Sequence, residues 1–572
     1  MGFELENFGD AQLDADYVTY LVEEVHPDAL ERYERFWNYF RNPLLPLAAL
    51  GGRMANTHCR PYFQAQEAGL PARITGVARG MGGGEQITDL RRKEVVIEND
   101  IAWRIETAID FLFGHKPVIR CLADQPAVAA AVEAVLGALL EANGGVGFLQ
   151  ELALFGAVYG FVDIALRPPA ESSQAQPQSP WRLSGQPVSA LPAAAETGRP
   201  GTSPGSGFGY TAGAAPGPTA SAVARAVAFA AGLQLEAVEA PRVLPILDEN
   251  DYRRLRYWIQ KYHKHPARMG EPSRPWYSMG LIRRPAGPEI VEVVEIISPT
   301  WWQRYEDRRL AAEGPNPLGV VPIVHIQNTA LPGSYDGSGE VEPLVALQDE
   351  LNTRLSDRAN RVTYQSFKMY LGKGIDDFLE RPVGPGQMWA THNLDARIEE
   401  FGSDPGSPSE DSHIEGVRQA LDKVSGVTPL AAGLIRGNVG NLTSATALKV
   451  VLGGLLARTA KKRQTYGAGL RRVFEMVLGW LDASGVLRTA PGDRCVEIHW
   501  PSPLPSDEGE QLRNAQIKAA LGIPTERILA ELGYQAPSSG SPQAASAERS
   551  AVSVVERLSV EAPQAADSDQ QE

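Results

Sequence analysis

The stretch VEPLVALQDELNTRLSDRANRVTYQSFKMYL, residues 341–371, decides the fold. Its apolar side chains recur in steps of three and four, which is the stripe of an amphipathic helix. They are Leu344, Leu347, Leu351, Leu355, Ala359 and Val362. At 1.5 Å per residue this helix would reach about 45 Å, so one stripe cannot bury it within a small domain. We therefore expect lateral packing against other helices, from this chain or from other subunits.

The same helix carries acids four residues before arginines, the order that supports a helix by a few tenths of a kcal/mol per pair. The two expected pairs are Glu350 with Arg354 and Asp357 with Arg361.

Strands and shorter helices precede this helix. The runs at 289–309 and 319–328 are rich in β-branched residues and predict strands. Further upstream, residues 88–114 place Ile97, Ile101, Ile105 and Ile109 at helical spacing. Two more helical patterns follow, and the alternation in FVDIAL, residues 161–166, predicts a strand. The pattern indicates an α+β fold.

A short segment rich in Pro-Gly turns follows the long helix, with strand-like runs at 387–391 and 397–401. A second helical pattern covers 411–426. The stretch RGNVGNLTSATALKVVLGGLLARTAKKRQ, residues 436–464, then places a Gly/Asn-rich loop before a third helix, which Thr443 can cap. This helix could approach about 60 Å. Its expected bend points are Gly453, Gly454, Gly467 and Gly469.

The third helix is basic although the chain, at 572 residues, has a formal net charge of -15. No carboxylate lies between Asp422 and Glu475, and the rest of the chain therefore carries about -24. The cations in this interval are Lys423, Arg436, Lys449, Arg458, Lys461, Lys462, Arg463, Arg471 and Arg472. Two interpretations stay open: contact with a polyanion such as nucleic acid, or pairing with acidic surfaces of this chain or a neighbouring subunit.

Composition narrows the class of protein. The three cysteines stand far apart and suggest neither a disulfide framework nor a zinc site. The acidic first residues lack the features of a signal peptide, and no stretch of about 18 apolar residues predicts a membrane span. Residues 167–221 are a low-complexity insertion, and residues 536–572 are a polar tail that we expect to be disordered.

Motifs for catalysis are weak. The Gly-rich run RGMGGGEQITD lacks the GK[ST] ending of a phosphate-binding P-loop. His263 and His265 lack a nearby third metal ligand, and GSYDGSG does not place a serine as a nucleophile elbow requires. We therefore expect neither an enzyme nor a metal site.

Four passages, in this order, resemble the portal proteins of tailed bacteriophages. They are the helix-glycine-strand passage at 91–119, the strand-loop-long helix passage at 316–374, the loop-long helix passage at 426–481 and the closing strand, Pro-Leu-Pro stretch and helices at 496–532. The resemblance covers roughly residues 90 to 535, and its evidence is the order of the motifs. It does not include the insertion at 167–221.

The resemblance implies a portal fold assembled as a ring. Its expected parts are a wing (1–335, containing the insertion), a first stem helix (336–372), a small α/β clip (373–410), a second stem helix (411–427), a tunnel loop (428–443), a long wing helix with the closing strand (444–505) and a helical crown (506–535). Leu344, Leu347, Leu351 and Leu355 would pack the stem.

The resemblance also implies a function in the virion. A homo-oligomeric ring, usually of twelve subunits, would form the channel at the capsid vertex for packaging and ejection of double-stranded DNA. The loop residues Arg436, Asn438, Asn441 and Thr443 would face DNA without sequence preference, with Lys449 in the helix behind them.

The implied partners are the large subunit of the terminase, head-tail adaptors, and the major capsid and scaffold proteins, with assembly in the host cytoplasm and no membrane contact. No cofactor is implied, because ATP hydrolysis would belong to the separate terminase motor. Two alternatives remain: a hydrolase with an unrecognised site, and another ring-forming connector of the virion.

Overall fold

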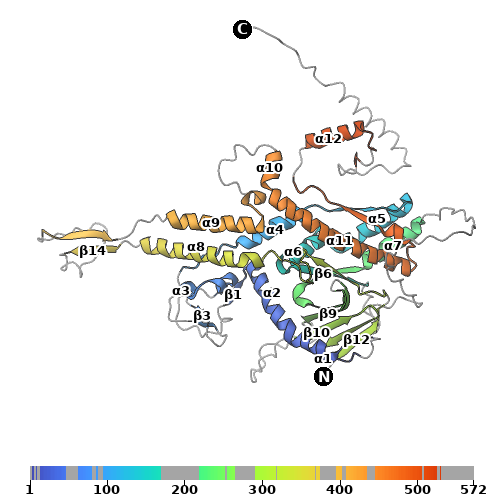
Figure 1. Cartoon of the computed structure of the whole chain (residues 1–572), viewed down its shortest axis with the longest axis horizontal. Helices are drawn as coiled ribbons and strands as arrows, with labels where there is room; N and C mark the ends of the chain where they lie inside the picture. The colour runs from blue at the N-terminus through green and yellow to red at the C-terminus, as the bar shows by residue number, and fades with distance from the viewer. Residues whose placement is uncertain are drawn as a thin grey trace, which may run out of the picture. The chain divides into compact units, whose positions relative to one another are not determined.

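The structure is a computed structural model. The residues that it describes are 3–5, 8, 13–46, 62–75, 77–79, 85–87, 94–168, 218–251, 254–264, 290–316, 318–366, 369–373, 394–401, 408–433, 445–504, 508–524 and 528–529. The chain separates into two compact units, residues 1–503 and 504–572. The first unit holds all the sheets of the described part (Figure 1).

A five-stranded antiparallel sheet forms one part of the first unit. Its order is β12-β11-β10-β9-β8, with β8 at Val243–Leu247, β9 at Leu255–Lys264, β10 at Val291–Ile297, β11 at Trp301–Glu306 and β12 at Arg309–Pro315. The strands predicted within 289–309 are confirmed. Phe3 and Phe8 at the amino terminus are buried against this sheet, and the ring of Phe3 meets Tyr305 edge-on.

The amino-terminal helical segment runs from this sheet toward the core. It consists of α1 (Ala15–Tyr20), a π-helical turn η1 (Leu21–Val25) and α2 (His26–Arg41). Small antiparallel pairs accompany it: β1 (Leu44–Pro46) with β2 (Tyr62–Gln64), and β3 (Val77–Arg79) with β4 (Glu85–Ile87); the short helical pieces η3 (Ala65–Gly69) and α3 (Ala72–Thr75) lie between these pairs.

A three-stranded antiparallel sheet lies at the centre of the core, in the order β13-β6-β7. Its middle strand β6 (Phe161–Arg167) is buried almost throughout, which confirms the predicted strand. β13 (Ile323–Gln327) and β7 (Gln234–Glu239) flank it, and a short helical turn η4 (Ala240–Arg242) follows β7. The helices that share this core are α4 (Asp100–Phe113), α5 (Pro126–Ala142), α6 (Val146–Tyr159) and α7 (Ala220–Gly232).

Within the described part of the helix predicted over 88–114, helical structure begins only at Asp100, so the prediction was wrong for residues 94–99; residues 88–93 lie outside the described residues. The Asn99 side chain accepts a hydrogen bond from the Ala102 amide at 3.3 Å and caps the helix there. Residues 94–99 are instead extended, and Ile97 does not belong to the helical stripe. The predicted insertion also starts and ends inside regular structure, because Arg167 is the last residue of β6 and Ser221 lies in α7.

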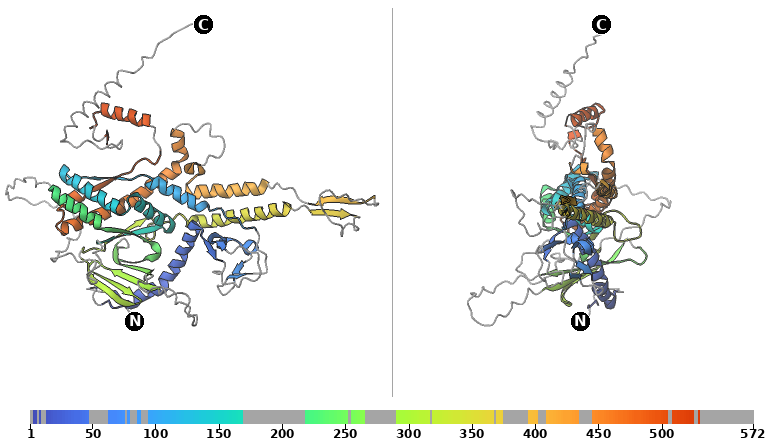
Figure 2. Two further views of the ribbon diagram at one scale, coloured as in Figure 1. Left: turned by 180° about the vertical axis from the view of Figure 1, so that it is seen from behind. Right: turned by 90° about the vertical axis from the view of Figure 1, so that its left-hand side faces the viewer.

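The long helix predicted at 341–371 is α8 (Val345–Ser366), preceded by the short turn η5 (Glu342–Leu344). The prediction was wrong at its end, because residues 369–371 lie in a β-strand. It lies side by side with α9 (Pro408–Ser425), as the views from both sides show (Figures 1 and 2). Leu344 and Leu351 are buried in the main core, and Leu347 and Leu355 pack against it.

Of the two ion pairs predicted to support this helix, one is present. Glu350 accepts from Arg354 at 2.7 Å, which confirms the first pair. The second pair is wrong, because Arg361 pairs with Glu410 on α9 and Asp357 lies 2.9 Å from Arg73. The neighbouring helix thus competes successfully with the local partner.

A two-stranded antiparallel pair connects α8 and α9 in the sequence. It joins β14 (Met369–Lys373) to β15 (Arg397–Phe401), which confirms the strand predicted at 397–401. The run predicted at 387–391 lies outside the described residues.

The third helix is divided. α10 (Ala445–Val451) is followed, after a break at Leu452, by α11 (Gly453–Ala483). The expected bend at Gly453 and Gly454 therefore occurs, whereas α11 continues as one helix through Gly467 and Gly469. At Gly469 the missing side chain serves close packing, since a Cβ there would overlap the Ile326 side chain, at 2.5 Å from Cδ1.

Substituting alanine for Gly469 is expected to lower the free energy of unfolding by about 1–3 kcal/mol, because Ile326 is buried in the strand β13 and cannot move aside freely. Denaturant unfolding of the full chain measures this. Gly479→Ala in the same helix is the matched control, because its nearest neighbour is the flexible end of Arg494 at 3.5 Å. Equal stability of the two variants would contradict the packing role.

The first unit closes with two short elements. After the turn η8 (Pro491–Arg494), β16 (Val496–His499) pairs antiparallel with β5 (Val118–Cys121). In the second unit the structure describes the helix α12 (Glu508–Ala520). No single helix of the described residues is long and apolar enough to cross a membrane, although the bent pair of α5 and α6 passes that test together.

Candidate functional site

The predicted DNA-facing loop falls outside the described residues. Arg436, Asn438, Asn441 and Thr443 therefore have no described position. Lys449 lies in α10 and is exposed, and its neighbour Val450 is 76% exposed. The described part of this helical region thus begins on the surface, and Leu452 is the first buried residue in it.

Both flanks of the loop are anchored on the core. Before it, α9 ends at Ser425 and leads into the short turn η7 (Pro429–Ala432). After it, Arg458 of α11 donates to the Val424 carbonyl at 2.6 Å. This is a cation at a helix carboxyl terminus, where the helix dipole favours it. Val427 and Leu455 pack together with Ala108 of α4, so the chain leaves and re-enters the core at neighbouring points.

The basic helix uses some of its cations inside the chain. Lys462 is buried and paired with Glu340, so the reading of an internal pairing surface holds for this residue. Arg463 donates to the Pro501 carbonyl at 2.9 Å and lies over the Trp500 ring. Burial lowers the pKa of Arg463.

Other cations of the interval remain exposed. Within the part of the chain that the structure describes, no acid lies within 4.0 Å of them. These residues are Lys423, Lys449, Lys461, Arg471 and Arg472. They are available for a partner.

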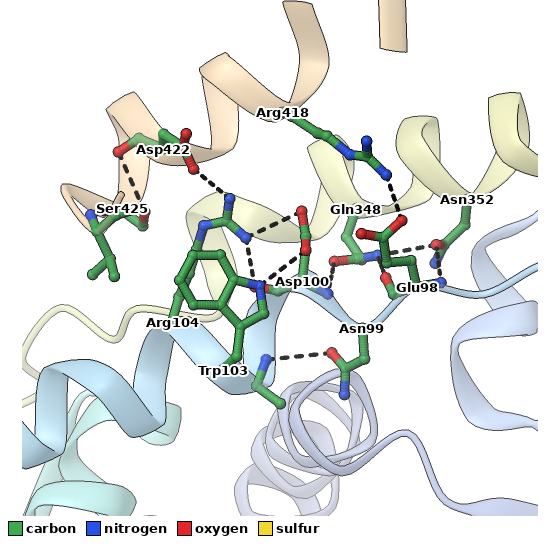
Figure 3. A network of polar contacts seen from close by, with 12 residues as sticks. Glu98, Asn99, Asp100, Trp103, Arg104, Gln348, Asn352, Arg418, Asp422 and Ser425 are labelled. Atoms are coloured by element: carbon green, nitrogen blue, oxygen red, sulfur yellow. Dashed lines mark hydrogen bonds and ion pairs between the residues drawn. The ribbon is translucent and has the colours of Figure 1, made fainter. Parts of the chain in front are cut away.

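A polar network ties α9 to the start of α4 (Figure 3). Arg104 is 2% exposed and reaches Asp100 at 3.1 Å and Asp422 of α9 at 2.5 Å. Its guanidinium also lies over the Trp103 ring, 4.2 Å from the centroid. One turn away, Arg418 of α9 pairs with Glu98 at 2.6 Å. Breaking a buried ion pair leaves an uncompensated charge in the interior and strongly destabilises the folded state. The paired Arg104 therefore fixes α9 on α4.

The extended segment 94–100 is held along α8 by a ladder of side chains, part of which Figure 3 shows. Each second amide of the segment donates to a polar side chain one helical turn further along α8. The pairs are Asp100 to Gln348 at 3.1 Å, Glu98 to Asn352 at 3.0 Å, Val96 to Ser356 at 3.0 Å and Glu94 to Asn360 at 2.9 Å. We call Gln348, Asn352, Ser356 and Asn360 the polar ladder.

The ladder works because two spacings match. Two residues of an extended chain span about 6.6 Å, close to the roughly 6 Å between residues four apart on a helix. Three of its side chains also donate back to carbonyls of the segment, so each such rung forms two bonds. The ladder therefore satisfies a backbone edge that no strand pairs in the described part of the chain.

The loop before α8 is fixed by a second buried network. Asp163 of β6 is fully buried and accepts from Trp258 Nε1 at 2.8 Å and from the Tyr335 hydroxyl at 2.9 Å. His325 Nδ1 lies 2.7 Å from Asp163, and His325 Nε2 lies 2.8 Å from the Tyr335 carbonyl. Through these two contacts the His325 ring links the buried Asp163 to the loop before α8.

Residues 289–534 match the family model described as phage portal protein, SPP1 Gp6-like. The resemblance to phage portal proteins is confirmed. The match begins shortly before β10 and covers α8, β14, β15, α9, α10, α11 and α12. The passage at 91–119 lies outside it, and its end falls one residue before the expected limit of 535.

A solved structure described as "Virion of native gene transfer agent (GTA) particle" is similar at a TM-score of 0.37 and 12% identity. The similarity covers 75% of this chain and 88% of that one. No curated protein matches the sequence.

The polar ladder and Arg104 were not predicted from the sequence. Gln348, Asn352, Ser356 and Asn360 stand four residues apart, and this regular stripe of uncharged polar side chains was a usable signal. Arg104 gave no sequence signal, because its partner Asp422 is more than 300 residues away in the chain. A single cation in an amphipathic helix is also common.

Proposed function

We propose that the chain is the ring-forming portal subunit through which double-stranded DNA is packaged into a phage capsid and later ejected. The match of residues 289–534 to the portal family carries the proposal. The paired helices α8 and α9, and the loop between α9 and the basic helix, support it. The proposal gives the chain a structural role, with no cofactor of its own.

The parts of the chain are assigned accordingly, as elements of one subunit. We assign a wing to residues 1–335, stem helices to 336–372 and 411–427, a clip to 373–410, a tunnel loop to 428–443, a long wing helix and closing strand to 444–505 and a crown to 506–535. The clip would dock the terminase large subunit and then the head-tail adaptor, and the outer wing would meet capsid and scaffold proteins.

The tunnel loop would contact DNA as it moves. Arg436 and the exposed Lys449 would supply cations, and Asn438, Asn441 and Thr443 would supply neutral hydrogen-bonding groups. A few cations per subunit, repeated around a ring, attract phosphates without reading bases. A chain of net charge -15 would discourage DNA from adhering elsewhere.

The double substitution Arg436→Ala and Lys449→Ala tests the tunnel assignment. We expect packaging of DNA into filled capsids to fall by about tenfold or more, because each ring loses two phosphate contacts per subunit. Rings should still form, because Lys449 contacts no acid of its own chain in the described part. Nuclease-protected DNA in assembled particles is the measurement.

The matched control is Arg488→Ala, which removes an exposed cation outside the loop. Unchanged packaging by rings that carry the double substitution would contradict the tunnel assignment. Loss of rings by the control and the double variant alike would instead show a general effect of charge.

A further inference from the structure

The exposed face of α11 is basic over three turns. Lys461, Gln464, Ala468, Arg471 and Arg472 are all exposed, whereas the opposite face, with Tyr466, Leu470 and Val473, is buried. We call these five exposed residues the basic stripe. Its three cations pair with no acid in the described part of the chain, and it spans about 16 Å. A cation that only stabilises the fold would be expected to have an internal partner, as Lys462 does with Glu340.

The amino-terminal helical segment presents a face of opposite sign. Glu24, Asp28, Glu31 and Glu34 follow one another at helical spacing, and all are exposed. We call these four residues the acidic face, and it spans about 15 Å. None of the four pairs with a cation among the described residues, although Arg32 on the same helix pairs with Asp336.

The two surfaces are opposite in charge and similar in length, and neither pairs with another residue in the described part of the chain. A second copy of the chain can bring the two surfaces together. A contact between two different surfaces of identical subunits is heterologous, and such contacts generate rings when the rotation closes. The pairing would also offset part of the repulsion between copies that each carry a net charge of -15.

DNA fits the basic stripe less well than a second copy. Glu475 is exposed one turn beyond Arg471 and would repel a polyanion, whereas it is harmless in a protein interface. Ala468 is exposed between Lys461 and Arg471, and such a short side chain allows another helix to approach closely.

We propose that the basic stripe of one subunit docks on the acidic face of the next subunit and so forms part of the contact that closes the ring. The inference rests on the proposed function for the ring itself and names a surface for it. Because exposed ion pairs are weak singly and screened by salt, the contact acts through repetition around the ring and weakens as ionic strength rises.

Charge reversal in the full chain tests the pairing. One variant carries Arg471→Glu and Arg472→Glu, and a second carries Glu24→Lys and Asp28→Lys. Each alone is expected to raise the concentration for half-assembly by about tenfold or more, because like charges then face each other. Mixing the two variants should restore rings, since each reversed surface meets a complementary one, and so should all four changes in one chain. Sedimentation velocity measures assembly, and circular dichroism confirms folding.

The matched control is Lys423→Glu with Arg488→Glu, which changes net charge equally at two exposed cations outside both surfaces. Control chains should assemble like the wild type. Normal assembly of either reversed variant, or no rescue in the mixture of folded variants, would overturn the pairing. Normal rings that lose binding of random-sequence DNA would show that the stripe faces DNA instead. If the wild-type chain never forms rings, both the proposed ring and this inference are contradicted. That outcome differs from one in which the wild type forms rings and the variants do not behave as expected.

Discussion

Replacing Arg104 with methionine is expected to lower the free energy of unfolding by about 3–5 kcal/mol. The methionine keeps the apolar length of the side chain but leaves the buried Asp100 and the half-buried Asp422 without their cation. An unpaired carboxylate in the interior has lost its hydration and has no cation or hydrogen-bond donor to compensate for that loss, so the folded state is destabilised. Chemical denaturation of the full chain, followed by tryptophan fluorescence, measures the loss.

Arg73→Met is the control for this prediction. Its ion pair with Asp357 has a similar separation, 2.9 Å, but the arginine is half exposed, so we expect a loss of at most about 1 kcal/mol. If both variants show the same small decrease in the free energy of unfolding, the network between α4 and α9 does not contribute the stability assigned to it.

Replacing Asn352 with leucine is expected to cost about 2–4 kcal/mol. The Asn352 side chain is fully buried, accepts from the Glu98 amide and from Gln348, and donates to Gln66 at 2.9 Å. Leucine has a similar volume but leaves these groups buried without partners. The amides of segment 94–100 should also exchange with solvent faster, which hydrogen exchange followed by mass spectrometry detects.

Gln419→Leu serves as the control, because Gln419 is an exposed residue of α9 and its loss should change stability by less than about 0.5 kcal/mol. Unchanged exchange of residues 94–100 in the Asn352 variant would show that the polar ladder does not hold the segment on α8.

The long helices could be predicted from the sequence because their signal is local. The apolar stripe from Leu344 to Leu355 follows from helical periodicity alone. The helix predicted at 411–426 is α9, which begins three residues earlier, at Pro408. The basic character of α11 could also be predicted, because it depends only on the residue composition of the segment.

Features that depend on distant residues could not be predicted. The periodicity through Ile97 suggested a longer α4, but the tertiary contacts of Glu94, Val96 and Glu98 with α8 hold that segment extended. Arg361 pairs with Glu410 of α9 rather than with its local acid. Helix propensity is a weak prior, and partners that the fold brings together override it.

The mass of the purified full chain tests the central claim most directly. Multi-angle light scattering at low and high salt, with negative-stain images of the same fraction, should show a ring of about twelve 61.8 kDa subunits around a central hole. A monomer or dimer that also fails to join rings when capsid and scaffold proteins are supplied would contradict the portal function.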